Sequence, residues 1–217
     1  MFDVAANPAA IDAHLADNGL RASVERAQGV RVPGAFDGFE LAVRAILGQQ
    51  VTVKGASTLM SRLTSAFGDT IECDAQALTH LAPTAVRIAS ASPEAIREIG
   101  IPNARAATIH AVASRVASGA LDLDAPAHGP TLVEQLVELP GIGPWTADYI
   151  AMRVAKWSDS FPASDIALRH ALSDASPKAM ISMAERWRPY RAYAAMRLWL
   201  HGGVAMNPPD ASARTSP

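Results

Sequence analysis

The stretch that most constrains the fold of this chain is Pro140-Gly141-Ile142-Gly143-Pro144. Proline lacks the backbone donor and clashes with the preceding helical turn, and glycine loses the most conformational entropy, so this string cannot lie inside a helix. Apolar residues recur at helical spacing before it and again after it, starting from a proline that suits the first position of a helix. The segment therefore predicts two helices joined by a tight turn.

The glycine turn is compatible with two roles. Glycines can leave backbone N–H groups pointing outward beside a helix N-terminus, where the partial positive charge favours an anion such as phosphate. Alternatively, the glycines only satisfy the geometry of a helical hairpin. The glycines alone do not choose between a phosphate site and an ordinary turn.

The residues on either side of the glycine turn form a longer sequence motif. Leu-Pro-Gly-Ile-Gly at residues 139–143 is followed by Thr146 and Ala147. This pattern resembles the helix-hairpin-helix signature of the DNA glycosylase superfamily that includes endonuclease III. In that family the hairpin grips the DNA backbone, and an aspartate downstream of it does the chemistry. Asp165, in the stretch Phe-Pro-Ala-Ser-Asp at residues 161–165, occupies the matching place.

Trp145 and the stretch Ile-Leu-Gly-Gln-Gln at residues 46–50 bring the resemblance closer to the alkylated-base branch, DNA-3-methyladenine glycosylase II. The resemblance covers most of residues 1–203. It implies an enzyme that flips out and excises alkylated purines, such as 3-methyladenine, from double-stranded DNA by hydrolysing the N-glycosidic bond in base excision repair. Bifunctional relatives carry a Schiff-base lysine where this chain has Trp145, so the resemblance implies a monofunctional glycosylase without AP-lyase activity.

No segment shows sustained strand alternation, which predicts an all-α fold. The resemblance implies two helical lobes with a helix-hairpin-helix motif and an active cleft between the lobes. We expect residues 38–157 to form the lobe with the hairpin, residues 1–37 and 158–203 to form the second lobe, and residues 204–217 to be a disordered tail. Longer family members carry an additional N-terminal mixed α/β domain. We expect that the residues before Ile11 do not supply it, so that the chain is either a short natural form or a fragment.

Periodicity and capping residues place the helices along the chain. A short helix is predicted for residues 7–18, followed by a loop to residue 36. Asp37 caps a helix that ends at a corner near residues 48–50, and a second helix runs from there to residue 67. Short helices beginning near prolines fill residues 74–118, and two more are predicted near residues 177–186 and 190–201.

Asp165 itself has two readings. It lies at or just after a predicted helix start, with Ser164 as the expected cap, where the helix dipole favours an ionised carboxylate. Position alone favours capping, whereas the match to the family's aspartate favours catalysis. Cleavage of an N-glycosidic bond develops positive charge on the sugar, and a fixed carboxylate stabilises that charge or orients water.

Aromatic residues are the candidates for the base pocket. Trp145, Tyr149 and Met152 share one helical face, and such a stripe usually belongs to a core. In the resembling family, aromatic residues here and at Trp199 line the pocket for the flipped base. Alkylated purines are electron-poor and often cationic, so aromatic faces bind them by stacking and cation–π attraction.

The remaining DNA-binding candidates are glutamines and hairpin residues. Gln49 and Gln50 lie at a helical corner, which is either an exposed turn or, as in the family, the wedge that fills the space left by the extruded nucleotide. Gln50 is the preferred wedge. The hairpin contributes Gly141, Gly143 and Thr146. Basic residues near the C-terminus are either solvated or phosphate ligands: Arg186, Arg188, Arg191 and Arg197.

Composition limits the other function classes. A net charge of -2 means that any DNA contact comes from a local patch rather than from the global field. The single cysteine, Cys73, excludes an internal disulfide and a Cys-ligated iron–sulfur cluster. No apolar run is long enough to span a membrane, and the N-terminus lacks the pattern of a signal peptide, so we expect a cytoplasmic location. We also expect the protein to be a monomer.

No cofactor is expected. The histidines His110, His128 and His170 have no spacing to Cys73 that suggests zinc. The resemblance instead implies a monovalent cation, held by the backbone carbonyls of Val137, Leu139 and Gly141.

Two other functions remain open at this stage. The first is a noncatalytic DNA-binding module in which the hairpin only grips phosphate. The second is a glycosylase of the same fold that acts on mismatched or oxidised bases.

Overall fold

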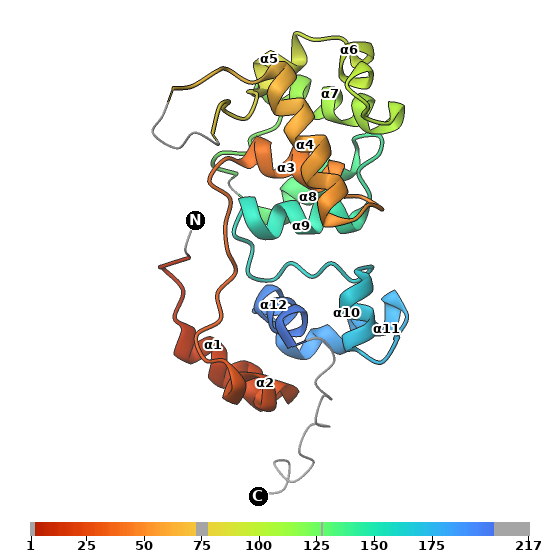
Figure 1. Cartoon of the computed structure of the whole chain (residues 1–217). Coiled ribbons are helices and arrows are strands. Elements are labelled where there is room, and N and C mark those ends of the chain that lie inside the picture. The colour runs from red at the N-terminus through yellow and green to blue at the C-terminus, as the bar shows by residue number, and fades with distance from the viewer. Residues whose placement is uncertain (1–2, 73–77, 127, 202–217) are drawn as a thin grey trace, which may run out of the picture. The chain divides into compact units, whose positions relative to one another are not determined.

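The computed structural model describes residues 3–72, 78–126 and 128–201. Helices dominate it (Figure 1). Within these residues the only extended pairing is an isolated antiparallel bridge between Thr70 and His80. The all-α prediction is confirmed. Cys73 and the predicted tail at residues 204–217 lie outside the described residues. No described helix combines the length and the apolar character that crossing a bilayer requires.

The chain divides into two compact units, residues 35–150 and residues 1–34 together with 151–217. The division lies at residues 150–151, inside a helix, whereas the sequence placed the end of the first lobe at residue 157. The units are called the hairpin unit and the aspartate unit below, after the motif and the residue that each contains.

The hairpin unit packs its helices around α7. Its elements are α3 (Gly38–Leu47), α4 (Val53–Phe67), α5 (Ala85–Ala89), α6 (Pro93–Glu98), α7 (Asn103–Ala117), α8 (Gly129–Val137) and the first turns of α9 (Pro144–Val154). Helix α7 contacts α3, α5 and α6. Residues Ile109 and Val112 of α7 are fully buried. The other helices therefore pack against the buried side of α7.

Local signals set the helix starts in this unit. Asp37 accepts a hydrogen bond from Glu40 N at 2.7 Å, which confirms the predicted cap of α3. Thr52 caps α4 by accepting from Gly55 N at 3.1 Å. Each cap satisfies a backbone donor that the first turn of a helix leaves without an intrahelical partner. The Thr52 cap lies at the corner between α3 and α4, whereas the Asp37 cap lies at the opposite end of α3.

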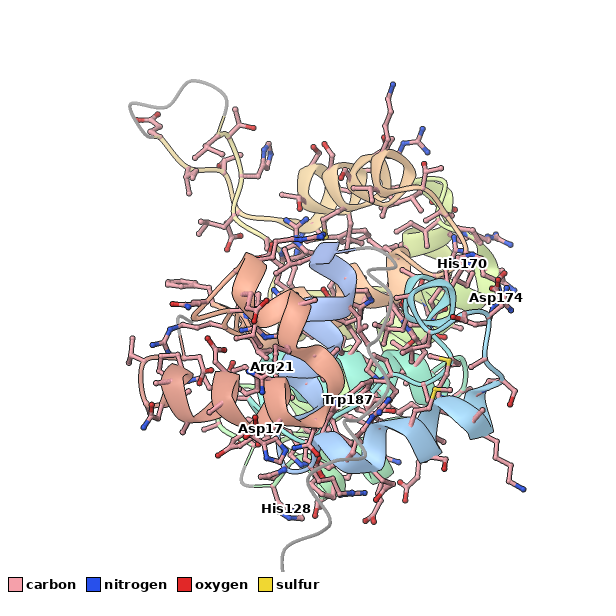
Figure 2. The ribbon with its side chains drawn as sticks, turned by 90° about the horizontal axis from the view of Figure 1, so that it is seen from below. Asp17, Arg21, His128, His170, Asp174 and Trp187 are labelled. Atoms are coloured by element: carbon pink, nitrogen blue, oxygen red, sulfur yellow. The ribbon has the colours of Figure 1, made fainter. Side chains whose placement is uncertain are left out.

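The aspartate unit is assembled from the two ends of the described chain. It contains α1 (Pro8–Leu15), the π-helical turn η1 (Ala16–Leu20), α2 (Arg21–Arg26), α10 (Ile166–Ala171), α11 (Pro177–Ala184), the 3-10 turn η2 (Glu185–Trp187) and α12 (Arg191–His201). Trp187, labelled in Figure 2, is fully buried in its core, and its indole Nε1–H donates to Asn18 O at 3.0 Å. Helix α12 packs against α10 and α2.

The predicted loop between residues 19 and 36 is wrong in its first part. Gly19 adopts φ +94°, and instead of ending the helical segment it kinks the chain, which continues as α2. Glycine accepts this backbone conformation at no steric cost. Leu20 and Val24 then lie in the core, and this burial stabilises a short helix that local propensity does not predict.

A buried ion pair ties the N-terminal segment to α12. Arg197 is fully buried, pairs with Asp12, and also donates to Ser23 O at 3.2 Å and Ala27 O at 2.7 Å. The second carboxylate oxygen of Asp12 accepts from Gly29 N at 2.7 Å. Arg197 is therefore a structural residue, and both interpretations of it, as a solvated side chain and as a phosphate ligand, are wrong.

Candidate DNA interface and active site

The helical hairpin predicted from the glycine turn is present between α8 and α9. Its loop is closed by two backbone hydrogen bonds of 3.1 Å, from Leu139 N to Leu136 O and from Ile142 N to Leu139 O. Gly141 adopts φ +88°, the left-handed conformation that favours glycine. Pro144 begins α9, and the loop glycines Gly141 and Gly143 are exposed.

Thr108 of α7 supports the hairpin from inside the unit. This buried hydroxyl lies 2.9 Å from both Ala104 O and Pro140 O. A Cβ placed on Gly141 would come within 2.1 Å of the Thr108 oxygen, whereas a Cβ on Gly143 would meet nothing within 4 Å. The two glycines thus have different roles: Gly141 is required by the fold, and Gly143 leaves open space outside the turn.

Gln49, at the corner between α3 and α4, holds the hairpin from the other side. Its side-chain Nε2 donates to Gly141 O at 3.1 Å and to the hydroxyl of Thr146 at 3.0 Å. Its backbone carbonyl accepts a hydrogen bond from Arg105 of α7. Thr146 is buried, so its side chain faces Gln49 and not solvent.

Gln50, the next residue, is exposed and has a positive φ of +54°. Such a conformation is uncommon for a residue other than glycine and persists only where the surrounding structure determines it. Val53, at the first position of α4, is 85% exposed. The corner therefore presents a polar and an apolar side chain to solvent beside the hairpin.

The aromatic stripe is divided along α9. Trp145 and Tyr149 are both partly exposed and stack with ring centroids 5.4 Å apart and an interplanar angle of 8°. Met152, one turn further on, is fully buried in the core of the aspartate unit. Of the three residues on this face of α9, Met152 therefore belongs to the core, whereas the aromatic pair remains partly accessible to solvent.

Asp165 is the N-cap of α10. Its Oδ1 accepts from Leu168 N at 2.8 Å, so the cap is Asp165 itself and the expectation that Ser164 fills this position is wrong. The same oxygen accepts from the indole Nε1–H of Trp199 at 3.0 Å. These two bonds come from different helices, α10 and α12, and together they fix the orientation of the carboxylate. Trp199, expected in the base pocket, is a direct partner of the aspartate.

The structure brings the predicted site residues together in two groups. The hairpin unit holds the glutamines, the loop glycines, Thr146 and the Trp145–Tyr149 pair, and the aspartate unit holds Asp165 and Trp199. Sequence reasoning missed Thr108 and Arg105. Threonines and arginines are ordinary helix residues, and no motif marks the ones whose partners lie far away in the chain.

Metal ligands are sparse in the described part of the chain. It contains no cluster of three or more His, Cys, Asp or Glu side chains that could hold a metal ion. His128 lies 3.2 Å from the Thr131 hydroxyl, and His170 lies 2.9 Å from Asp174 at the end of α10 (Figure 2).

The carbonyls expected to hold a monovalent cation are at the hairpin. The oxygen of Leu139 accepts a hydrogen bond from Ile142 N, and that of Gly141 accepts one from the Gln49 side chain. A carbonyl oxygen has two lone pairs, so it can accept a hydrogen bond and bind a cation at the same time. The arrangement is compatible with such an ion, which stays a prediction.

Comparison with known proteins agrees with this geometry. The family model described as "HhH-GPD superfamily base excision DNA repair protein" matches residues 43–188, and the model described as "AlkA N-terminal domain" matches residues 1–37. The fold and the hairpin define the class, helical proteins built around a helix-hairpin-helix motif. Within that class, the chain belongs to the HhH-GPD superfamily of base excision DNA repair proteins.

Individual relatives point in the same direction. The chain is 32% identical over 203 residues to DNA-3-methyladenine glycosylase 2 of Escherichia coli, covering 94% of this chain and 70% of the relative. It is 42% identical over 204 residues to the "Probable bifunctional transcriptional activator/DNA repair enzyme AlkA" of Mycobacterium tuberculosis, covering 92% of this chain but only 40% of that relative. The resemblance to the helix-hairpin-helix glycosylases is confirmed.

Among solved structures, the chain is similar to 3-methyladenine DNA-glycosylase from Archaeoglobus fulgidus. The TM-score is 0.75 at 25% sequence identity, and the match covers 91% of this chain and 70% of that chain.

Proposed function

We propose that this protein is a monofunctional DNA glycosylase that removes alkylated purines from double-stranded DNA, acting as a monomer in base excision repair. The observation that carries the proposal is Asp165, whose Oδ1 is fixed by Leu168 N and by the Trp199 indole. The names of the relatives, among them DNA-3-methyladenine glycosylase 2, support the choice of alkylated purines as substrate.

DNA binding is assigned to the hairpin. The first N–H groups of a helix have no intrahelical acceptor, and the partial positive charge at that end attracts anions. The exposed backbone at Gly143 precedes α9 and carries no side chain, so a phosphate can approach it closely. Contacts of this kind position the protein without reading sequence.

Base recognition is assigned to the stacked pair Trp145 and Tyr149. Alkylation leaves a purine electron-poor and often cationic, and an aromatic face attracts such a ring through its quadrupole. An ordinary purine lacks that charge and remains stacked in the duplex, so the cost of flipping selects against it. Gln50, exposed on a backbone of positive φ, is the residue assigned to fill the vacated space.

Bond cleavage is assigned to Asp165. As the bond between the base and the sugar breaks, the bonding electrons leave with the base, and the sugar becomes cationic. The ionised carboxylate stabilises that cation and orients a water molecule, which supplies the hydroxyl group that replaces the base and releases its other hydrogen as a proton to solvent. The product is an abasic site. Trp145 offers no amine, so no Schiff base forms and the backbone stays intact.

The proposal is tested with duplexes that each carry one defined lesion: an alkylated purine, an oxidised base or a mismatch. We expect alkali-labile abasic sites only in the duplex with the alkylated purine. The control is Asp174→Asn, which removes an exposed carboxylate near the end of α10 and should retain activity. Cleavage confined to oxidised or mismatched bases would replace the substrate assignment. DNA binding without any base release would make the protein a noncatalytic module.

A further inference from the structure

The inference concerns Gln49 and rests on the proposed function. Its two amide hydrogens are both committed inside the protein, one to Gly141 O and one to the Thr146 hydroxyl. Gly141 O can only accept, so the nitrogen of the amide, and not its oxygen, must face the hairpin. What remains of the amide is its oxygen, an acceptor, which cannot bind the acceptor oxygens of a phosphate.

The same residue is tied to the corner at its backbone. Its carbonyl accepts from Arg105 of α7, and its N–H donates to Ile46 O at 3.3 Å at the end of α3. The side chain thus reaches the hairpin while the main chain belongs to the corner. The hairpin in turn rests on α7 through Thr108, which lies 2.9 Å from Pro140 O. Corner, hairpin and α7 are joined in a closed set of hydrogen bonds.

The residue that follows is the one assigned to enter the duplex. Gln50 has φ +54°, a strained conformation for a residue with a side chain, and the anchored Gln49 determines its starting point. The wedge must enter the space that the extruded nucleotide leaves, next to the phosphate bound by the hairpin. Its distance from that phosphate must therefore be fixed, because a small misplacement of a functional side chain greatly reduces the rate.

We propose that Gln49 is a positioning residue that couples the phosphate-gripping hairpin to the wedge at Gln50. In this role Gln49 does not contact DNA. Its amide holds the corner and the hairpin at one separation, so that binding of the hairpin to the backbone sets where the wedge enters the duplex. This role adds to the proposed function, because it specifies how phosphate binding by the hairpin is linked to extrusion of the base.

The experiment separates extrusion from binding. The duplex carries one alkylated purine with 2-aminopurine beside it, whose fluorescence rises when the neighbouring base leaves the stack. The variants are Gln49→Leu, which removes both bonds, and Thr146→Val, which removes one acceptor at nearly constant shape. The control is Gln135→Leu on α8. Affinity is measured on an undamaged duplex, and base release in single-turnover reactions.

We expect extrusion to slow by about fivefold when one bond is lost and by about ten- to thirtyfold when both are lost. Affinity for the undamaged duplex should stay within about threefold of wild type, because the loop glycines and the start of α9 are untouched. Thr146 is buried, so an effect of Thr146→Val on extrusion cannot come from a lost side-chain contact with DNA. Gln135→Leu should behave as wild type.

Three results would overturn the role of Gln49: an equal loss of affinity and extrusion in Gln49→Leu, an unchanged extrusion rate in both variants, or an effect of the same size in Gln135→Leu. If Gln49→Leu does not fold, Thr146→Val alone decides by the same criteria. Failure of the proposed function looks different, because the wild-type protein itself then releases no alkylated base.

Discussion

Replacing each loop glycine with alanine separates the fold requirement from the DNA requirement in the hairpin. Gly141 has φ +88°, and a Cβ there would lie 2.1 Å from the Thr108 hydroxyl. Gly143 has no such φ, and a Cβ there meets nothing within 4 Å. We therefore expect Gly141→Ala to destabilise the protein and Gly143→Ala to leave its stability unchanged.

The magnitude for Gly141→Ala has two parts. Placing alanine in the left-handed region costs about 1–2 kcal/mol. Displacing the Thr108 hydroxyl weakens the hydrogen bond that its single proton shares between Ala104 O and Pro140 O, with a net contribution of about 0.5–1.5 kcal/mol. The sum is about 1.5–3.5 kcal/mol, which at about 2–4 °C per kcal/mol for a chain of this size lowers the Tm by about 3–14 °C.

Thermal unfolding followed by circular dichroism measures these differences. The double variant Thr108→Ala/Gly141→Ala removes the steric overlap and should show only the backbone cost when compared with Thr108→Ala alone. Equal Tm losses in Gly141→Ala and Gly143→Ala, or a change below about 0.5 kcal/mol in Gly141→Ala, would refute the reasoning.

The DNA requirement is measured with Gly143→Ala. A methyl group at this exposed position keeps a phosphate away from the start of α9, so affinity should fall for all duplexes alike. A loss confined to one lesion type would contradict the assignment of the hairpin to the backbone. The salt dependence of wild-type binding should be modest, because few phosphates are contacted.

Three further predictions follow from the aspartate unit and from Trp145. Asp165→Asn should lower base release by about a hundredfold or more because an amide cannot balance the sugar cation, while affinity is retained; near-normal turnover would exclude the catalytic role. Borohydride during turnover should trap no protein–DNA adduct, and a trapped complex that disappears when one lysine is mutated would overturn the monofunctional assignment. Arg197→Met should lower the free energy of unfolding by about 3–5 kcal/mol in a denaturant titration, because Asp12 is left buried without its partner; a loss below about 1 kcal/mol would contradict this.

Local signals determined most of the helix boundaries. Asn7, Asp37 and Ser176 are caps whose side chains accept from first-turn amides, and proline stands at the start of several helices. These effects act within one turn of the chain, so they can be read in sequence. Gly19 was misread for the opposite reason, because burial of Val24 against residues far away in the chain decides whether a helix continues after it.

The candidate site divides in the same way. The hairpin and the downstream aspartate follow from a motif, since turn geometry and capping require specific residues at fixed spacing. The sequence by itself thus determined where the turn lies, which helices flank it and which carboxylate to test. Only the tertiary structure decided that Gln49 bonds Gly141 and Thr146, that Thr108 supports the loop, and that Trp199 holds Asp165. These contacts join residues 32 to 97 positions apart, and such pairings depend on how packed helices bring side chains together, which local propensity does not encode.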